Sequence, residues 1–191
     1  MPAVRYLVDD VDAALLSFRA GESADALTVS ALATQVFLDT YAPEGIRPDI
    51  AREVFAVCSQ AAFGERLLAR DRVFILAEQS GHLVGFGELS VGPALPVPGM
   101  ELRGAELIRL YVQPAHQGHR IGAQLLQRAE AHSKAAGTGL MWLTAWAGNH
   151  RALAFYKAQG YLDTGATPYV FEGRSYENRV LVRRLPDAAA G

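Results

Sequence analysis

Cysteine and long apolar runs are both scarce in this sequence, and each scarcity argues against a class of protein. The 191 residues include a single cysteine, Cys58, so no disulfide can form within the chain. No apolar run approaches the roughly 20 residues that a membrane-spanning helix needs, and residues 1–16 lack the ordered regions of a signal peptide. We therefore predict a cytoplasmic protein without a membrane partner.

An excess of charge of one sign is missing as well. Lys and Arg number 18 and Asp and Glu number 20, so bulk electrostatics give no reason to expect a nucleic-acid partner. His116 and His119 lie close together, but no carboxylate or thiol accompanies them at metal-ligand spacing, and we expect no metal. With 50% hydrophobic residues, the chain has the composition of one globular domain with a sizeable core.

Hydrophobic periodicity and turn residues predict a series of helices and strands. Helices are predicted over residues 22–40, 49–68 (one helix or a pair), 121–136 and 150–159, and strands over residues 17–20, 73–77, 83–90, 105–112, 140–145, 161–166 and 180–184. Prolines and glycines predict an exposed loop over residues 91–103. The strand–helix–strand segment 105–145 is a crossover unit flanked by hairpins, which predicts a mixed α+β sheet with helices on both faces.

One domain is expected over residues 17–185. Residues 1–16 are interpreted as an N-terminal extension, and residues 186–191 as a C-terminal tail.

A loop with the sequence QGHRIG, residues 117–122, joins the strand predicted over 105–112 to the next helix. Backbone N–H groups at a helix N-terminus form a ready anion site. Gly118 and Gly122 allow a close approach of the backbone to a ligand. The loop by itself can be an ordinary glycine turn at a helix N-terminus, but its place directly after a strand favours a site for a cofactor that carries phosphate.

A second motif, NHRALAFYKAQGY at residues 149–161, follows the strand predicted over 140–145. Asn149 suits a helix N-cap, and Ala152, Phe155 and Tyr156 share one helix face. The segment matches the pattern N-x-x-A-x-x-F-Y-x-x-x-G-F/Y of the GCN5-related N-acetyltransferase (GNAT) superfamily. With the loop before it, the chain resembles this superfamily over roughly residues 17–185.

The resemblance implies an α/β/α fold with a mixed, mostly antiparallel seven-stranded sheet, and acetyl-CoA as co-substrate. The superfamily's loop pattern is Gln/Arg-x-x-Gly-x-Gly/Ala, in which Arg120 replaces the first glycine. The cofactor contacts that the resemblance implies are Leu110, Tyr111, Val112, Gln117, Gly118, His119, Arg120, Ile121, Gly122, Ala123, Asn149 and Tyr156.

Catalysis by such an enzyme needs a proton donor and a proton acceptor. The resemblance makes Tyr156 the general acid that protonates the departing thiolate, although a helical tyrosine can equally be a core aromatic. The attacking amine, with a pKa near ~10.4, must first lose a proton. Glu106 is the first candidate base and Glu88 the second, and each can instead be an ordinary strand-end charge.

Short blocks, including FLDTY at residues 37–41, resemble bacterial polyamine acetyltransferases of the PaiA type. This resemblance implies spermidine or spermine as the amine, with Asp39, Tyr41 and Glu44 lining its groove unless they are solvated surface residues. Two alternatives stay open. The acceptor is a protein N-terminus, a lysine or a drug amine, or the protein is a non-catalytic acyl-CoA sensor. The resemblance is compatible with a homodimer.

Overall fold

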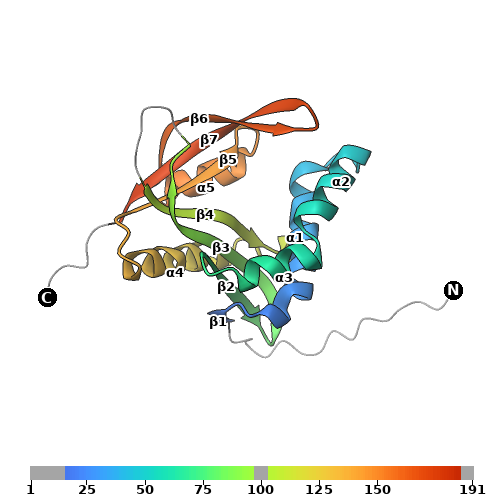
Figure 1. Cartoon of the computed structure of the whole chain (residues 1–191). Coiled ribbons are helices and arrows are strands. Elements are labelled where there is room, and N and C mark those ends of the chain that lie inside the picture. Colours follow the sequence, from blue (N-terminus) through green and yellow to red (C-terminus); the bar gives the residue numbers. More distant parts are fainter. Residues whose placement is uncertain (1–15, 97–102, 186–191) are drawn as a thin grey trace, which may run out of the picture.

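Seven strands form one mixed sheet in the computed structural model, which describes residues 16–96 and 103–185 (Figure 1). Their order is β1-β2-β3-β4-β5-β7-β6, and only the neighbours β4 and β5 are parallel. The strands are β1 (Leu16–Ala20), β2 (Arg72–Gln79), β3 (His82–Ala94), β4 (Arg103–Val112), β5 (Leu140–Trp146), β6 (Leu162–Phe171) and β7 (Arg174–Arg184). The predicted fold class is confirmed. The predicted tail, and the predicted extension apart from residue 16, lie outside the described residues.

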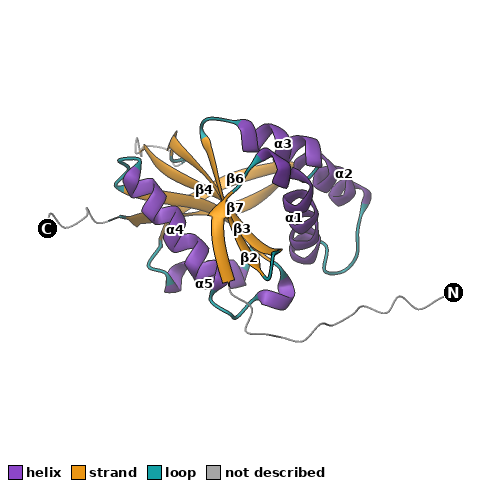
Figure 2. Ribbon diagram, turned by 90° about the horizontal axis from the view of Figure 1, so that it is seen from below, coloured by secondary structure: helices purple, strands orange, loops and turns teal. Residues whose placement is uncertain are grey.

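Helices cover both faces of this sheet. They are α1 (Ala26–Tyr41), α2 (Pro48–Val57), α3 (Gln60–Leu68), α4 (Ile121–Ala135) and α5 (His150–Ala158). Figure 2 shows α1, α2 and α3 on one side of the strands and α4 and α5 on the other. Val29 and Phe63 pack with Phe86 under the first group, and Leu126 packs with Leu143 under the second. The sheet therefore separates two apolar cores.

Some predicted boundaries are wrong, each for a local reason. The helix predicted from residue 22 begins at Ala26, because a 3-10 turn at Ser23–Asp25 with its own capping box precedes it. The segment 49–68 forms the pair of helices that was one of its two predicted forms, since the Ser59 side chain caps a new N-terminus by accepting from the Ala62 N–H at 3.2 Å. The loop predicted from residue 91 is wrong at its start, because β3 runs to Ala94.

The last two strands are longer than predicted and form an overhanging hairpin. Glu172 and Gly173 join them with φ values of 46° and 71°, the backbone of a tight hairpin turn. Asn178 in β7 pairs with Trp146, the last residue of β5, so the hairpin continues beyond the end of β5. Its exposed tip, with Val170 69% accessible, buries no face that would give a clear alternating pattern.

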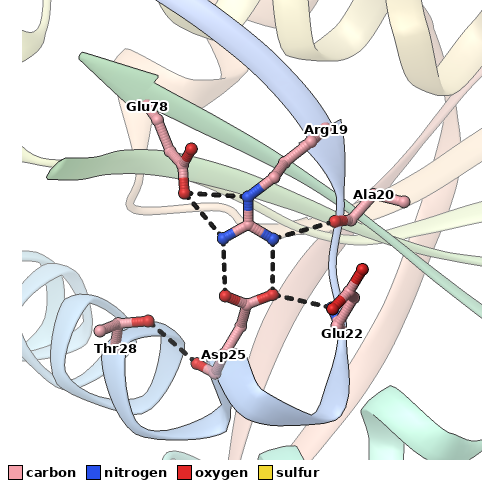
Figure 3. A network of polar contacts seen from close by, with 6 residues as sticks. All are labelled: Arg19, Ala20, Glu22, Asp25, Thr28 and Glu78. Carbon is pink, nitrogen blue, oxygen red and sulfur yellow. Dashed lines mark hydrogen bonds and ion pairs between the residues drawn. The ribbon is translucent and has the colours of Figure 1, made fainter. Parts of the chain in front are cut away.

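A network around Arg19 fixes the start of α1 to the edge of the sheet (Figure 3). The guanidinium donates to both carboxylate oxygens of Asp25, each at 2.7 Å, and to Glu78 on β2. Asp25 also accepts from the Glu22 N–H at 2.8 Å. Arg19 therefore joins β1, β2 and the turn that leads into α1, and its guanidinium lowers the pKa of the Asp25 carboxyl.

The parallel strands β4 and β5 meet at one end and part at the other. They pair at Ala105↔Met141 and Glu106↔Trp142. At the close end only glycine fits at position 104, because a Cβ there would lie 2.5 Å from the Leu140 carbonyl oxygen. Beyond Glu106 the two strands share no further pairs, so the second half of β4 has an unpaired edge toward β5.

In the described part of the chain, no helix combines the length and apolarity needed to cross a bilayer. The same residues contain no cluster of three or more His, Cys, Asp or Glu side chains that could hold a metal ion.

Candidate active site

A cavity of about 450 Å³ is lined by the diverging end of β4, the loop before α4 with the first turn of that helix, one side of α5 and the end of α1. Every predicted cofactor contact except His119 lines this cavity. Sequence reasoning missed other parts of its wall, including His116, Arg151, Phe155 and Gln159. The cavity therefore brings together the two sequence motifs, which lie about 30 residues apart.

The loop before α4 depends on two left-handed backbone positions. Gly118 has a φ of 86° and Arg120 a φ of 62°. A Cβ at Gly118 would meet nothing within 4 Å, so glycine serves its backbone conformation rather than a lack of space. Arg120 is the N-cap of α4 and occupies the position of the superfamily's first loop glycine. The glycine pattern thus has a conformational cause, and Arg120 retains that conformation as a non-glycine residue.

Side-chain hydrogen bonds hold this loop between β4 and α5. The Gln117 Nε2 donates to the Val112 carbonyl oxygen at 2.9 Å, and the Arg151 Nη2 donates to the Gln117 Oε1. Gln117 therefore ties the loop to the end of β4. Arg151 adds a second guanidinium to the cavity wall, which Arg120 also lines. Cationic side chains and backbone N–H groups at a helix N-terminus suit a ligand with several phosphate groups.

Tyr156 lies on α5. Its side chain is buried in the core, and it also forms part of the cavity wall. The ring packs edge-on against Phe155 and Tyr161, at centroid distances of 5.1 and 5.7 Å. Burial raises the pKa of Tyr156, and the neighbouring Tyr41 adds to this effect. A tyrosine hydroxyl is protonated at neutral pH in any case, and this shift keeps it so, which leaves the group able to donate a proton.

Asn149 caps α5 as predicted, because its side-chain oxygen accepts from the Ala152 N–H at 3.1 Å. The same residue lines the cavity. A polar side chain thus stands where β5 passes into α5.

Of the three predicted acceptor residues, only Tyr41 lies on the cavity wall. Its ring is 4.8 Å from Phe37 and 6.1 Å from Trp146, between centroids. The Trp146 indole lies so close to Gly148 that a Cβ there would be 2.4 Å from it. Asp39 and Glu44 are exposed and do not line the cavity. The end of the cavity near α1 is therefore lined by Val36, Thr40 and Tyr41, and the Tyr41 ring packs against Phe37 and Trp146 behind the wall.

The two predicted bases do not line the cavity wall. Glu88 is fully buried and pairs with Arg109 at 2.5 Å, while Arg72 and Arg66 lie 3.6 and 3.9 Å from its carboxylate. Such a carboxylate is held in place by its cationic neighbours. Glu106 is partly buried, and burial raises the pKa of its carboxyl.

The sequence matches the acetyltransferase (GNAT) family over residues 38–161, which is more than half of the chain. The chain therefore belongs to this family. It is an acyl-CoA-dependent N-acetyltransferase.

Individual relatives agree with this assignment. Over 130 residues the chain is 24% identical to an uncharacterised N-acetyltransferase in the pepI 3′ region of Lactobacillus delbrueckii subsp. lactis, covering 68% of this chain and 75% of the relative. The solved structure of the PaiA N-acetyltransferase from Thermoplasma acidophilum, in complex with coenzyme A, is similar with a TM-score of 0.69. It is 22% identical, and the match covers 89% of this chain and 99% of that one.

A mutant of the spermidine N-acetyltransferase SpeG from Vibrio cholerae is similar with a TM-score of 0.63 and 18% identity. This match covers 89% of this chain and 94% of that one. Both structural similarities concern the fold.

Proposed function

We propose that the protein transfers the acetyl group of acetyl-CoA to a primary amine by direct attack in a ternary complex. The observation that carries the proposal is the continuous cavity that joins the phosphate-type loop, the end of β4 and the side chain of Tyr156. Acyl transfer from a thioester needs these parts together, because the cofactor must be held while its thiolate is protonated. The likeness to an acetyltransferase solved with coenzyme A supports this proposal.

In this proposal the pyrophosphate binds to the backbone N–H groups of the loop, helped by Arg120 and Arg151. The pantetheine arm pairs with the backbone of Leu110, Tyr111 and Val112 along the edge that β5 leaves unpaired. A ligand with amide groups can extend a sheet in this way, because main-chain hydrogen bonds supply the affinity.

Tyr156 acts as the general acid toward the thiolate. Glu106 remains the first candidate base, since its raised pKa makes it a stronger proton acceptor than an exposed carboxylate. Because Glu106 is not on the cavity wall, a water molecule has to carry the proton from the amine. Glu88 remains the second candidate, but its pairing with Arg109 favours a structural role.

For the acceptor we propose spermidine or spermine, supported by the likeness to a spermidine acetyltransferase. Tyr41 on the cavity wall, whose ring packs against Trp146, supplies an apolar surface for methylene chains. Asp39 and Glu44 can act only at the rim, given their exposure. A cytoplasmic location and a homodimer remain predictions.

The substitution Tyr156→Phe tests the mechanism. It removes the proton donor and leaves the ring packing intact, so kcat should fall by ~10²–10⁴-fold with little change in the KM for acetyl-CoA. The measurement is thiol release from acetyl-CoA with a panel of amines. Tyr161→Phe is the matched control, because Tyr161 packs against the Tyr156 ring but its hydroxyl bonds to Glu130. An unchanged kcat in Tyr156→Phe would show that Tyr156 serves packing alone.

A further inference from the structure

A buried carboxylate on α4 joins three separate parts of the fold. Glu130 is 8% exposed, and its Oε1 accepts from the Tyr161 hydroxyl at 3.1 Å and from the Arg183 Nη1 at 2.8 Å. Tyr161 lies just after α5, and Arg183 lies on β7. None of these three residues lines the cavity. A buried carboxylate needs such partners to offset its lost hydration, so the three side chains hold one another in place.

Tyr161 contacts Tyr156 in two ways. Its N–H donates to the Tyr156 carbonyl oxygen at 3.0 Å, as the outer bond of a Schellman motif that ends α5. Gly160 supplies the left-handed residue of this motif, with a φ of 84°, and donates to the Lys157 carbonyl oxygen at 3.0 Å. The Tyr161 ring also packs on the Tyr156 ring, with centroids 5.7 Å apart. The position of Tyr156 therefore depends on Tyr161 through both backbone and ring.

The helix α5 is held at both ends by residues of α4 and the loop before it. At its start, the Arg151 guanidinium donates to Gln117 in that loop. At its end, Tyr161 donates to Glu130. Tyr156 lies between these two ties. In the proposed function the phosphates bind at the start of α4, and the length of the pantetheine arm sets how far away the sulfur lies. The placement of α5 against α4 thus decides whether the Tyr156 hydroxyl reaches the sulfur.

We propose that Glu130 is a positioning residue for acyl transfer, which holds the Tyr161 hydroxyl and thereby keeps the Tyr156 hydroxyl beside the sulfur of the cofactor. The inference rests on the proposed function and adds a residue to its machinery. Glu130 acts through Tyr161 and touches neither cofactor nor acceptor. Arg183 supplies the counter-charge that keeps the buried carboxylate ionised as a hydrogen-bond acceptor.

The substitution Glu130→Leu tests this role, because it removes the acceptor and leaves a side chain of similar size. Its kcat should fall on the order of tenfold with an unchanged KM for acetyl-CoA, since a displaced proton donor slows the chemical step alone. Glu130→Gln keeps an oxygen that can accept from Tyr161 and should restore kcat to within about twofold of the parent. The measurement is thiol release from acetyl-CoA with the most active amine of the panel.

Tyr161→Phe breaks the same hydrogen bond from its other side and leaves every charge in place. It should reproduce the loss in Glu130→Leu, well below the loss in Tyr156→Phe, and it provides the test if Glu130→Leu does not fold. Ser133→Ala is the matched control on α4, because it removes another buried hydrogen bond, to the Ala129 carbonyl oxygen at 2.8 Å, and leaves Glu130 intact. Its kcat should equal that of the parent.

A double-mutant cycle separates positioning from a general effect on the fold. Glu130→Leu should not slow Tyr156→Phe further, because that variant has no hydroxyl left to position. Additive losses would overturn the proposal, as would full kcat in both Glu130→Leu and Tyr161→Phe, or an equal loss in Ser133→Ala. Failure of the proposed function gives a different result, namely no turnover with any amine or an unchanged kcat in Tyr156→Phe, and this inference would fall with it.

Discussion

Arg120 combines a left-handed backbone, φ 62° and ψ 8°, with a long cationic side chain at the N-cap of α4. A left-handed conformation costs an L-residue roughly 1–2 kcal/mol, and glycine removes this cost while losing roughly 0.5–1 kcal/mol through its freer unfolded chain. We therefore expect Arg120→Gly to raise the free energy of unfolding by about 0.5–1 kcal/mol.

Urea denaturation of Arg120→Gly measures this change, with Arg120→Ala as the control that removes the same charge but keeps the strain. The affinity for acetyl-CoA should stay within about tenfold, because backbone groups carry most of the phosphate binding. A larger loss of affinity in both variants would show that the guanidinium itself grips a phosphate. No gain in stability relative to Arg120→Ala would refute the strain argument.

Individual residues of the candidate site could be predicted where a sequence motif fixes their position within a loop or a helix. Gln117, Asn149 and Tyr156 belong to loop and helix motifs whose spacing alone sets their orientation, and all three line the cavity. Arg151 was missed because its place in the site comes from a contact with Gln117, which is 34 positions away in the chain. No local pattern marks such contacts.

The acceptor residues were harder to predict for the same reason. Asp39 and Glu44 lie near the end of α1 that lines the cavity, yet both are exposed. Sequence periodicity shows which face of α1 is buried, with Val29 and Val36 on it, but not which neighbouring element covers the rest.

At the scale of elements, the turn before α1 depends on the ion pair of Arg19 and Asp25 (Figure 3). Asp25→Asn should lower the free energy of unfolding at neutral pH by about 1 kcal/mol, because one bidentate pair is lost at a partly exposed site. Arg19 lowers the pKa of Asp25, so this stabilisation is present above the unfolded-state pKa near ~3.9 and is lost as the pH falls below it.

The check is urea denaturation of the parent and Asp25→Asn at several pH values between 7 and about 3. The difference between the two proteins should be constant above pH ~5 and shrink on acidification. Asp39→Asn is the matched control, because Asp39 is exposed and has no arginine partner within ion-pair distance in the described structure. A difference that does not depend on pH would assign the effect to the geometry of the turn rather than to its charge.

The main elements of the fold could be predicted because each has a strong periodic signal. The crossover from β4 through α4 to β5 was predicted within a few residues, since buried strands and an amphipathic helix alternate there. The β6–β7 hairpin was underestimated, because its tip packs on no sheet and its exposed residues carry no alternation. Its extent depends on a turn at Glu172 and Gly173.

At the scale of the whole molecule, binding of acetyl-CoA should stabilise the native state. A ligand bound by the native state alone, at about 100 times its Kd, adds about 2.7 kcal/mol. For a domain of this size that corresponds to a rise in Tm of about 5–10 °C. A thermal-shift assay with millimolar acetyl-CoA measures it, with sodium sulfate at the same ionic strength as the control. An unchanged Tm would exclude the cavity as the acetyl-CoA site.

The separation of β4 from β5 also bears on how the protein avoids aggregation. An open sheet normally exposes unpaired strand edges only at its two margins, where charge, prolines or short length discourage other chains from adding to it. Here a further edge lies in the middle of the sheet, along the second half of β4. If acetyl-CoA pairs with that edge as proposed, the cofactor shields it as a margin strand would. Abundance of the cofactor then protects the enzyme from aggregation, and scarcity shortens its lifetime.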